Sequence, residues 1–177
     1  TAGIGLLTLI TYTMVYTPLK QKTYTNTWFG GITGALPPVM GWTAAKGQLD
    51  WEVLPIFALL YFWQLPHFFA IAWMYRDDYK RGGFKMLSHY DSTGKKTSFQ
   101  MLMNCGMLCA ASLAVFVFNQ SSMFYLAGAS ILGVVFFFVI TLFHKESTSD
   151  NARKVFIASI IYLPFMVGIL VLDQFFI

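Results

Sequence analysis

Long apolar runs separated by short charged segments are the feature that most constrains the fold of this chain. Six runs lie at about residues 2–16, 28–45, 51–75, 99–119, 123–144 and 155–176. Most approach the ~20 residues that a helix needs to cross a bilayer. Only 11% of the residues are charged and 56% are hydrophobic, which leaves too little polar surface for a water-soluble fold. The sequence therefore predicts an all-α integral membrane protein with six transmembrane helices.

The start of the chain suggests a longer protein. Thr1 already lies in an apolar run, with no initiator methionine, basic segment or cleavage site before it, so this run is unlike a signal peptide. We expect residues 1–177 to form one partial transmembrane domain of a C-terminal portion. Its surroundings should be the lipid bilayer, with no nucleic-acid partner. Cys105 and Cys109 would share a helix face, where packing is favoured over a disulfide or a metal pair.

The basic residues predict how the helices are oriented in the membrane. Eleven of the twelve lysines and arginines follow the first, third or fifth run, and only Lys46 falls on the opposite side. The positive-inside rule places such segments in the cytoplasm or the mitochondrial matrix. We expect a multi-pass protein of the bacterial plasma membrane, with the mitochondrial inner membrane as the alternative.

The segment RDDYKR at residues 76–81 is the strongest candidate for chemistry. Asp77 and Asp78 would repel each other unless a cation lies between them, and Mg²⁺ is commonly held by one or two carboxylates and substrate phosphates. Arg76, Lys80 and Arg81 suit the remaining phosphate oxygens. The alternative is an ordinary solvated segment that serves topology and anionic lipid.

Two other polar side chains stay open to more than one interpretation. Lys20 should lie on the same membrane face as the acidic pair, where it would contact a phosphate or only set topology. His67 lies within the third run, after Pro66 and near Gln64. Ionisable groups at membrane depth usually face the bundle interior. His67 is therefore a haem or metal ligand, a base, or a hydrogen-bonded core histidine.

Four motifs carry a resemblance to a known family. YTPLK at residues 16–20, GGITGALPPVMGW at 30–42, WQLPHF at 63–68 and DDYKRGGFKML at 77–87 occur in this order. Together they resemble the protohaem IX farnesyltransferases (haem O synthases), a branch of the UbiA-type intramembrane prenyltransferases. The resemblance implies a nine-helix bundle, of which these six spans would be the last six. It also implies farnesyl transfer from farnesyl diphosphate to a vinyl group of haem B, with Mg²⁺ on the diphosphate.

The resemblance assigns roles to residues of this chain. It implies that the product would be handed over to haem A synthase. The expected metal ligands are Asp77 and Asp78; the expected diphosphate-binding residues are Lys20, Arg76, Lys80 and Arg81; the expected catalytic residues are Asp77, Asp78, Lys80 and Arg81; and the expected haem-cavity residues are His67, Trp63 and Phe68.

This sequence departs from the family pattern in one respect. The first aspartate motif, Asn-x-x-x-Asp-x-x-x-Asp, should precede Thr1, so half of the metal site is missing and the fragment alone is expected to be inactive. The residue four positions after Asp78 is Gly82, so this segment lacks an Asp-x-x-x-Asp pair. In this respect the segment resembles the haem branch of the family. The alternatives are a UbiA-type enzyme with an aromatic or chlorophyll-like acceptor, a transporter with proline-broken helices, and a structural membrane subunit.

Overall fold

The computed structural model describes residues 1–119 and 121–176, and all regular structure within them is helical. Five helical stretches in these residues are long and apolar enough to cross a membrane: Ala2–Lys22, Val53–Met74, Lys95–Phe118, Met123–Lys145 and Ser149–Asp173. The prediction of an all-α, multi-pass membrane protein is confirmed in this form. The remaining predicted span, at residues 28–45, corresponds to α3 (Asn26–Lys46). This helix has 21 residues but is less apolar than the other five.

The first helix is longer than the sequence predicted. α1 (Ala2–Ile10) continues through a π-helical turn, η1 (Thr11–Tyr16), into α2 (Thr17–Lys22). The predicted end near Tyr16 is therefore wrong, and Lys20 lies on a helix. Pro18 lacks an N–H donor, and the widened turn before it accommodates the ring. The Thr17 hydroxyl donates to the Tyr12 carbonyl oxygen at 2.9 Å, which satisfies one acceptor in that turn.

Glycines allow α3 to lie close to both of its neighbours. A Cβ at Gly30 would come within 2.6 Å of the Tyr16 ring, and one at Gly31 would come within 3.0 Å of Tyr61. α4 (Val53–Met74) reaches the same surface with Gln64, whose Nε2 donates to the Gly31 carbonyl oxygen at 2.6 Å. These contacts support close helix packing by this glycine-rich face.

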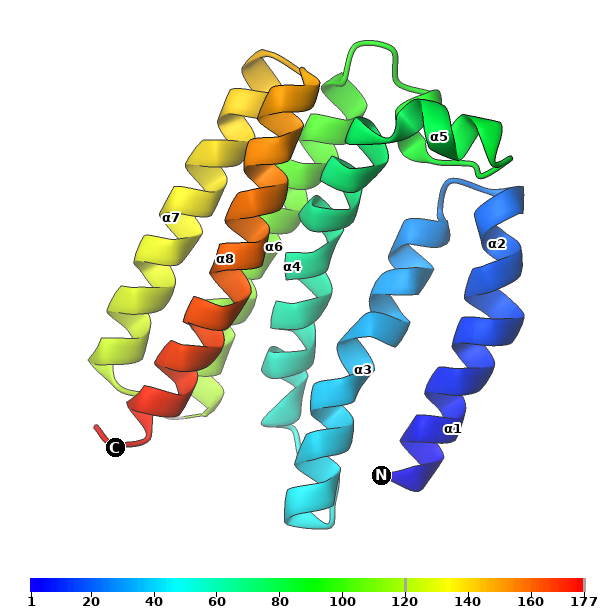
Figure 1. The fold of residues 1–177 in the computed structure, drawn as a ribbon. Coiled ribbons are helices and arrows are strands. Elements are labelled where there is room, and N and C mark those ends of the chain that lie inside the picture. The colour runs from blue at the N-terminus through cyan, green and yellow to red at the C-terminus, as the bar shows by residue number, and fades with distance from the viewer. Residues whose placement is uncertain (120, 177) are drawn as a thin grey trace.

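The remaining long helices pack around α4. α4 contacts α3, α6 (Lys95–Phe118) and α8 (Ser149–Asp173), and α7 (Met123–Lys145) packs on α6 and α8. Figure 1 shows the first helix at one edge of this arrangement and α7 with α8 at the other. Large buried side chains from α4, α6, α7 and α8 form the core, among them Leu65, Phe69, Met101, Leu108, Phe136, Ile140, Tyr162 and Met166. Both cysteines of α6 are free thiols, in agreement with packing.

Asp173 joins the end of α8 to the start of α7. Its side chain is fully buried. The carboxylate accepts hydrogen bonds from the backbone N–H groups of Ser122 at 3.1 Å and Tyr125 at 3.2 Å, and from the Ser122 hydroxyl. Backbone N–H groups at a helix N-terminus lack partners within the helix. Asp173 therefore satisfies the start of α7 from the end of α8.

Candidate functional site

The acidic pair lies in a short helix that follows α4 directly. α5 (Arg76–Arg81) has Asp77 and Asp78 in its first turn and Lys80 and Arg81 in its last. This arrangement of charges complements the helix dipole, which favours acids at the N-terminus and bases at the C-terminus. The charged segment of residues 76–81 is thus a helix and not an irregular loop. Burial raises the pKa of the Tyr79 phenol on the same helix, so it stays a neutral hydroxyl group.

A glycine ends α5 and turns the chain back. Gly83 has a φ of 73°, which glycine adopts without steric cost. Its N–H donates to the Lys80 carbonyl oxygen at 3.1 Å, and the Phe84 N–H donates to that of Tyr79 at 2.9 Å. The Phe84 and Tyr79 rings lie 6.0 Å apart. These bonds and this contact make up a Schellman motif, which fixes the direction in which the chain leaves the acidic helix.

The returning segment is bonded to α2 and α3. The Lys85 N–H donates to the Lys20 carbonyl oxygen at 2.8 Å. The Asn26 side chain, only 1% exposed, donates to the carbonyl oxygens of Lys85 and Thr23, each at 2.7 Å. The Ser88 hydroxyl donates to the Ala72 carbonyl oxygen at 2.8 Å. The segment after the acidic pair is thus held against three helices at one end of the protein.

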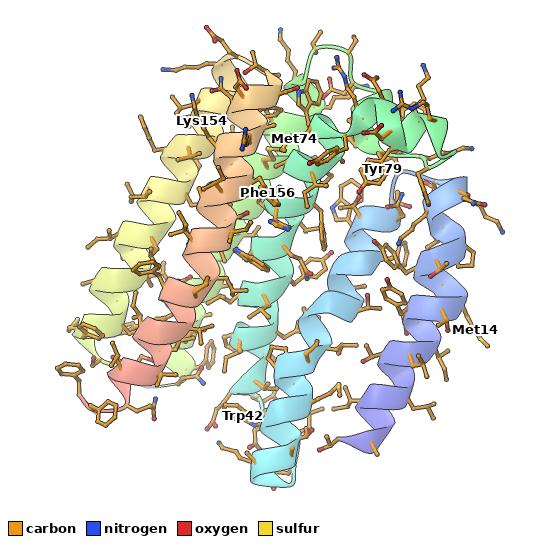
Figure 2. All side chains as sticks on the ribbon, in the orientation of Figure 1. Met14, Trp42, Met74, Tyr79, Lys154 and Phe156 are labelled. Atoms are coloured by element: carbon orange, nitrogen blue, oxygen red, sulfur yellow. The ribbon has the colours of Figure 1, made fainter. Side chains whose placement is uncertain are left out.

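Six basic residues and two acidic ones lie on α2, on α5 and on the segment that returns from α5. Asp78 forms an ion pair with Arg81, and both side chains are largely exposed. Lys20 lies with its Nζ 4.3 Å from the centre of the Tyr16 ring, and the Arg76 guanidinium lies 5.3 Å from the Trp73 ring. Figure 2 shows Tyr79 close to the ends of α2 and α3. The basic residues are Lys20, Lys22, Arg76, Lys80, Arg81 and Lys85. An excess of cations suits a polyanionic ligand.

The donor set here fits part of a magnesium site. Asp77 and Asp78 are both exposed and adjacent. No group of three or more His, Cys, Asp and Glu side chains that could hold a metal occurs among residues 1–119 and 121–176. Two carboxylates are nevertheless the protein contribution that Mg²⁺ commonly receives when phosphates supply the other ligands. The acidic helix can therefore share an ion with a phosphorylated ligand, but it does not supply a full set of metal ligands by itself.

The predicted haem-cavity residues lie apart from the charged end. His67 is two turns of α4 before its end at Met74, about 10 Å along the helix axis. Its ring stacks between Trp63 and Phe156, with centroids 5.5 and 5.1 Å away. Phe68 lies beside it, with its ring centroid 5.6 Å from that of His67. The predicted site residues therefore form two groups on different parts of α4 and its neighbours.

The hydrogen bonds of His67 determine its tautomer. Ser159 of α8 lies 2.8 Å from His67 Nδ1, and its hydroxyl donates to the Phe156 carbonyl oxygen at 2.6 Å. The Ser159 oxygen must then accept from Nδ1–H, which leaves Nε2 unprotonated in the neutral ring. The Trp63 indole N–H donates to the Ser159 carbonyl oxygen at 2.9 Å. His67 thus joins α4 to α8 and still has one free ring nitrogen.

Sequence reasoning missed Ser159 and the role of Asn26. Lys85, the partner of Asn26, is 59 residues away. Ser159 is a single hydroxyl in an apolar helix, 92 residues from His67. A buried asparagine just before an apolar run was the only local signal for the first contact. Nothing in the sequence near Ser159 indicates the second.

Comparisons with known proteins agree with this arrangement. The sequence profile of the UbiA prenyltransferase family matches residues 1–160. The chain is 42% identical to a protoheme IX farnesyltransferase of Solibacter usitatus over 173 residues, which is 98% of this chain and 59% of that protein. It is 39% identical to the mitochondrial protoheme IX farnesyltransferase of Arabidopsis thaliana, with 96% of this chain and 39% of that protein covered.

A solved structure has a similar fold. It comes from work on digeranylgeranylglyceryl phosphate synthase and matches with a TM-score of 0.81, covering 96% of this chain and 60% of that one. The sequence identity is 15%, so the match concerns the fold alone. The chain spans about three fifths or less of the relatives described here.

Proposed function

This chain belongs to the UbiA prenyltransferase family, and from that premise we propose that it acts within a protohaem IX farnesyltransferase. Together with the further segment that its relatives possess, it would transfer a farnesyl group from farnesyl diphosphate to a vinyl group of haem B, giving haem O and diphosphate. The similarity to protoheme IX farnesyltransferases over nearly the whole chain supports haem as the acceptor. Family membership also favours prenyl transfer over transport.

The observation that carries the proposal is the bond between the Lys85 N–H and the Lys20 carbonyl oxygen, at 2.8 Å. It brings the backbone of the acidic segment to that of Lys20, although the two segments are far apart in the sequence. Departure of an allylic diphosphate builds negative charge on the leaving oxygens, and preorganised cations stabilise that charge. In this proposal Lys20, Lys80 and Arg81 contact the diphosphate.

The acidic pair would orient the same leaving group. Asp77 and Asp78 would hold Mg²⁺ against the diphosphate, and the ion would neutralise charge on the departing oxygens when bound. Arg81, which pairs with Asp78, would keep that carboxylate directed along α5 and offer its remaining N–H groups to phosphate oxygens. Arg76 would add a further cation at the start of the helix. The apolar walls of the bundle would keep water from the allylic cation.

The second group of residues would receive the acceptor. The unprotonated Nε2 of His67 can coordinate a metal or accept a hydrogen bond, and Trp63 and Phe68 lie beside it. We assign to this group a contact with haem. Ser159 supports the assignment, because its bond to Nδ1 keeps Nε2 free.

The proposal also includes a membrane arrangement. α3 would cross the bilayer as a sixth span, because it is 21 residues long and packs along both α1 and α4. The charged end with Lys20 and α5 would face the cytoplasm or the mitochondrial matrix. A bacterial plasma membrane or a mitochondrial inner membrane would suit the two kinds of relative. Delivery of haem O to haem A synthase would follow at the same membrane.

Replacing Asp78 by Ala in the full-length protein tests the site. Conversion of haem B to haem O should fall by about 100-fold or more, a loss typical for groups that stabilise transition-state charge. Asp150→Ala is the matched control, since Asp150 is an exposed acid in the first turn of α8. Near-normal haem O formation by Asp78→Ala would overturn the metal and diphosphate roles. Supplying a phenolic acid in place of haem B tests the acceptor, and prenylation of that acid alone would overturn the haem assignment.

A further inference from the structure

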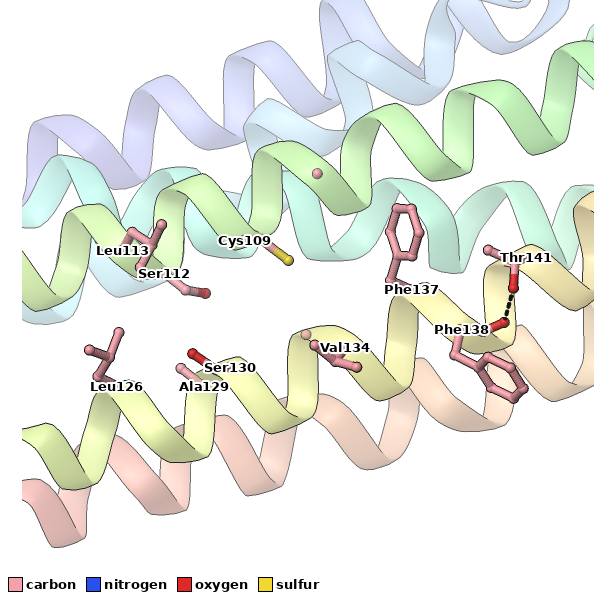
Figure 3. A pocket seen from close by; sticks show the side chains of 12 residues that line it. Cys109, Ser112, Leu113, Leu126, Ala129, Ser130, Val134, Phe137, Phe138 and Thr141 are labelled. Atoms are coloured by element: carbon pink, nitrogen blue, oxygen red, sulfur yellow. Dashed lines mark hydrogen bonds between the residues drawn. The ribbon is translucent and has the colours of Figure 1, made fainter.

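A long apolar groove runs between α6 and α7, away from the site on α2, α3 and α5. It has a volume of about 690 Å³, within the ~300–1,000 Å³ range of ligand-binding pockets. Along α7 it extends from Leu126 to Thr141, about 22 Å at the rise of a helix. Figure 3 shows the groove between the two helices, with Phe137 and Phe138 at one end and Leu126 at the other. The groove is therefore long and narrow.

Small side chains open the groove, and two of its three hydroxyl groups, those of Ser112 and Thr141 but not that of Ser130, are hydrogen-bonded to the backbone. Gly106 on α6 and Gly133 on α7 line it, together with Cys109. The Ser112 hydroxyl donates to the Leu108 carbonyl oxygen at 3.0 Å, and that of Thr141 donates to Phe138 at 2.6 Å. Along the whole groove the walls therefore offer the Ser130 hydroxyl as the one hydroxyl group without a protein partner among the described residues. A flexible hydrocarbon chain fits such a surface, and a polar ligand does not.

Lysine side chains lie beyond only one end of the groove in the described part of the chain. Lys145 follows Thr141 by about one turn on α7, and Nδ1 of the neighbouring His144 lies 2.9 Å from the Ser98 hydroxyl of α6. Lys95 begins α6 one turn before Ser98. Glu146 is the one exposed acid directly adjoining this group in sequence. Basic residues at the membrane surface attract anionic lipid headgroups. The opposite end, at Leu126, has no charged neighbour of this kind in α7.

We propose that this groove binds one acyl chain of an anionic phospholipid, whose phosphate contacts Lys145 and Lys95. The length of the groove and its apolar walls select an acyl chain, and the charge at one end selects the headgroup and the leaflet. The lining residues belong to α6 and α7 only, so the lipid does not enter the site that we assign to prenyl transfer.

Native mass spectrometry of the full-length protein in detergent, titrated with phosphatidylglycerol or phosphatidylcholine, tests the inference. Val134→Trp and Ser130→Trp place a large ring in the groove. Val135→Trp is the matched control. Both valines are largely exposed, Val135 by 53% and Val134 by 70%, but of the two only Val134 lines the groove. Both groove variants should reduce phosphatidylglycerol retention, whereas Val135→Trp should not. Equal retention by all three would overturn the groove as the binding site.

The headgroup contact has its own test. Lys145→Gln should weaken phosphatidylglycerol retention by about fivefold, as expected for one surface lysine. It should weaken phosphatidylcholine retention less, because the choline cation offsets the charge of its phosphate. Lys46→Gln, at the exposed end of α3, is the control. Equal retention of the two lipids by the unaltered protein would overturn the proposed headgroup selection. Thermal unfolding of each variant shows whether the bundle is intact, and the result does not depend on farnesyl transfer.

Discussion

Replacing Asp173 by Ala should destabilise the helical bundle at the membrane end opposite α5. The carboxylate is fully buried and accepts hydrogen bonds from the backbone N–H and hydroxyl groups of Ser122, which precedes α7, and from the backbone N–H of Tyr125 in the first turn of α7. A hydrogen bond to a charged group contributes about 1.5–3 kcal/mol. Water can replace part of the lost hydrogen bonding at Ser122, because this residue is only half-buried. We therefore expect a loss of about 2–4 kcal/mol in the free energy of unfolding.

Thermal unfolding of the full-length protein in detergent, followed by tryptophan fluorescence, measures this loss. The melting temperature of Asp173→Ala should fall by about 5–15 °C. Asp173→Asn keeps one oxygen acceptor and should show about half of the effect. Gln174→Ala, at the exposed neighbouring position, should stay within about 0.5 kcal/mol of the unaltered protein. A loss below about 1 kcal/mol for Asp173→Ala would refute this account of how α8 supports α7.

Two further substitutions test the segment behind the acidic helix. Asn26→Ala removes two hydrogen bonds, including the one to Lys85. It should raise the KM for farnesyl diphosphate by about three- to tenfold, with a smaller change in kcat. An unchanged KM would contradict the positioning role of Asn26. Gly83→Ala places a β-carbon at a φ of 73°, at a cost of about 1–2 kcal/mol, and should lower kcat/KM, whereas Gly83→Asn should restore much of it because asparagine tolerates this conformation. Equal activity of the Ala and Asn variants would show that backbone conformation at this position does not matter.

Local sequence patterns predicted much of the fold. Apolar runs located the long helices, because a segment inside the hydrocarbon must satisfy its backbone N–H and C=O groups within its own helix. The pattern failed at the first helix, where Pro18 and the following lysines suggested an earlier end than Lys22. It also failed at α5, whose six residues are too few for a periodic signal but are held as a helix by the turn at Gly83.

The candidate site was predictable only in part for a related reason. Adjacent carboxylates and nearby cations identified Asp77 and Asp78 from local chemistry. The contact between His67 and Ser159 joins residues 92 positions apart, and neither residue carries a local sign of the other. Asp173 had no basic neighbour in sequence and so had no evident partner. Its partners are backbone groups of another helix, which sequence patterns do not report.

The bond from Lys85 to Lys20 separates two properties that usually change together. It joins an N–H to a carbonyl oxygen, so either side chain can be exchanged without removing the bond. At this end of the protein the backbone path can therefore stay the same while the side-chain charges change. A charge reversal at Lys85, whose side chain is exposed, should therefore change the electrostatics and leave this bond in place.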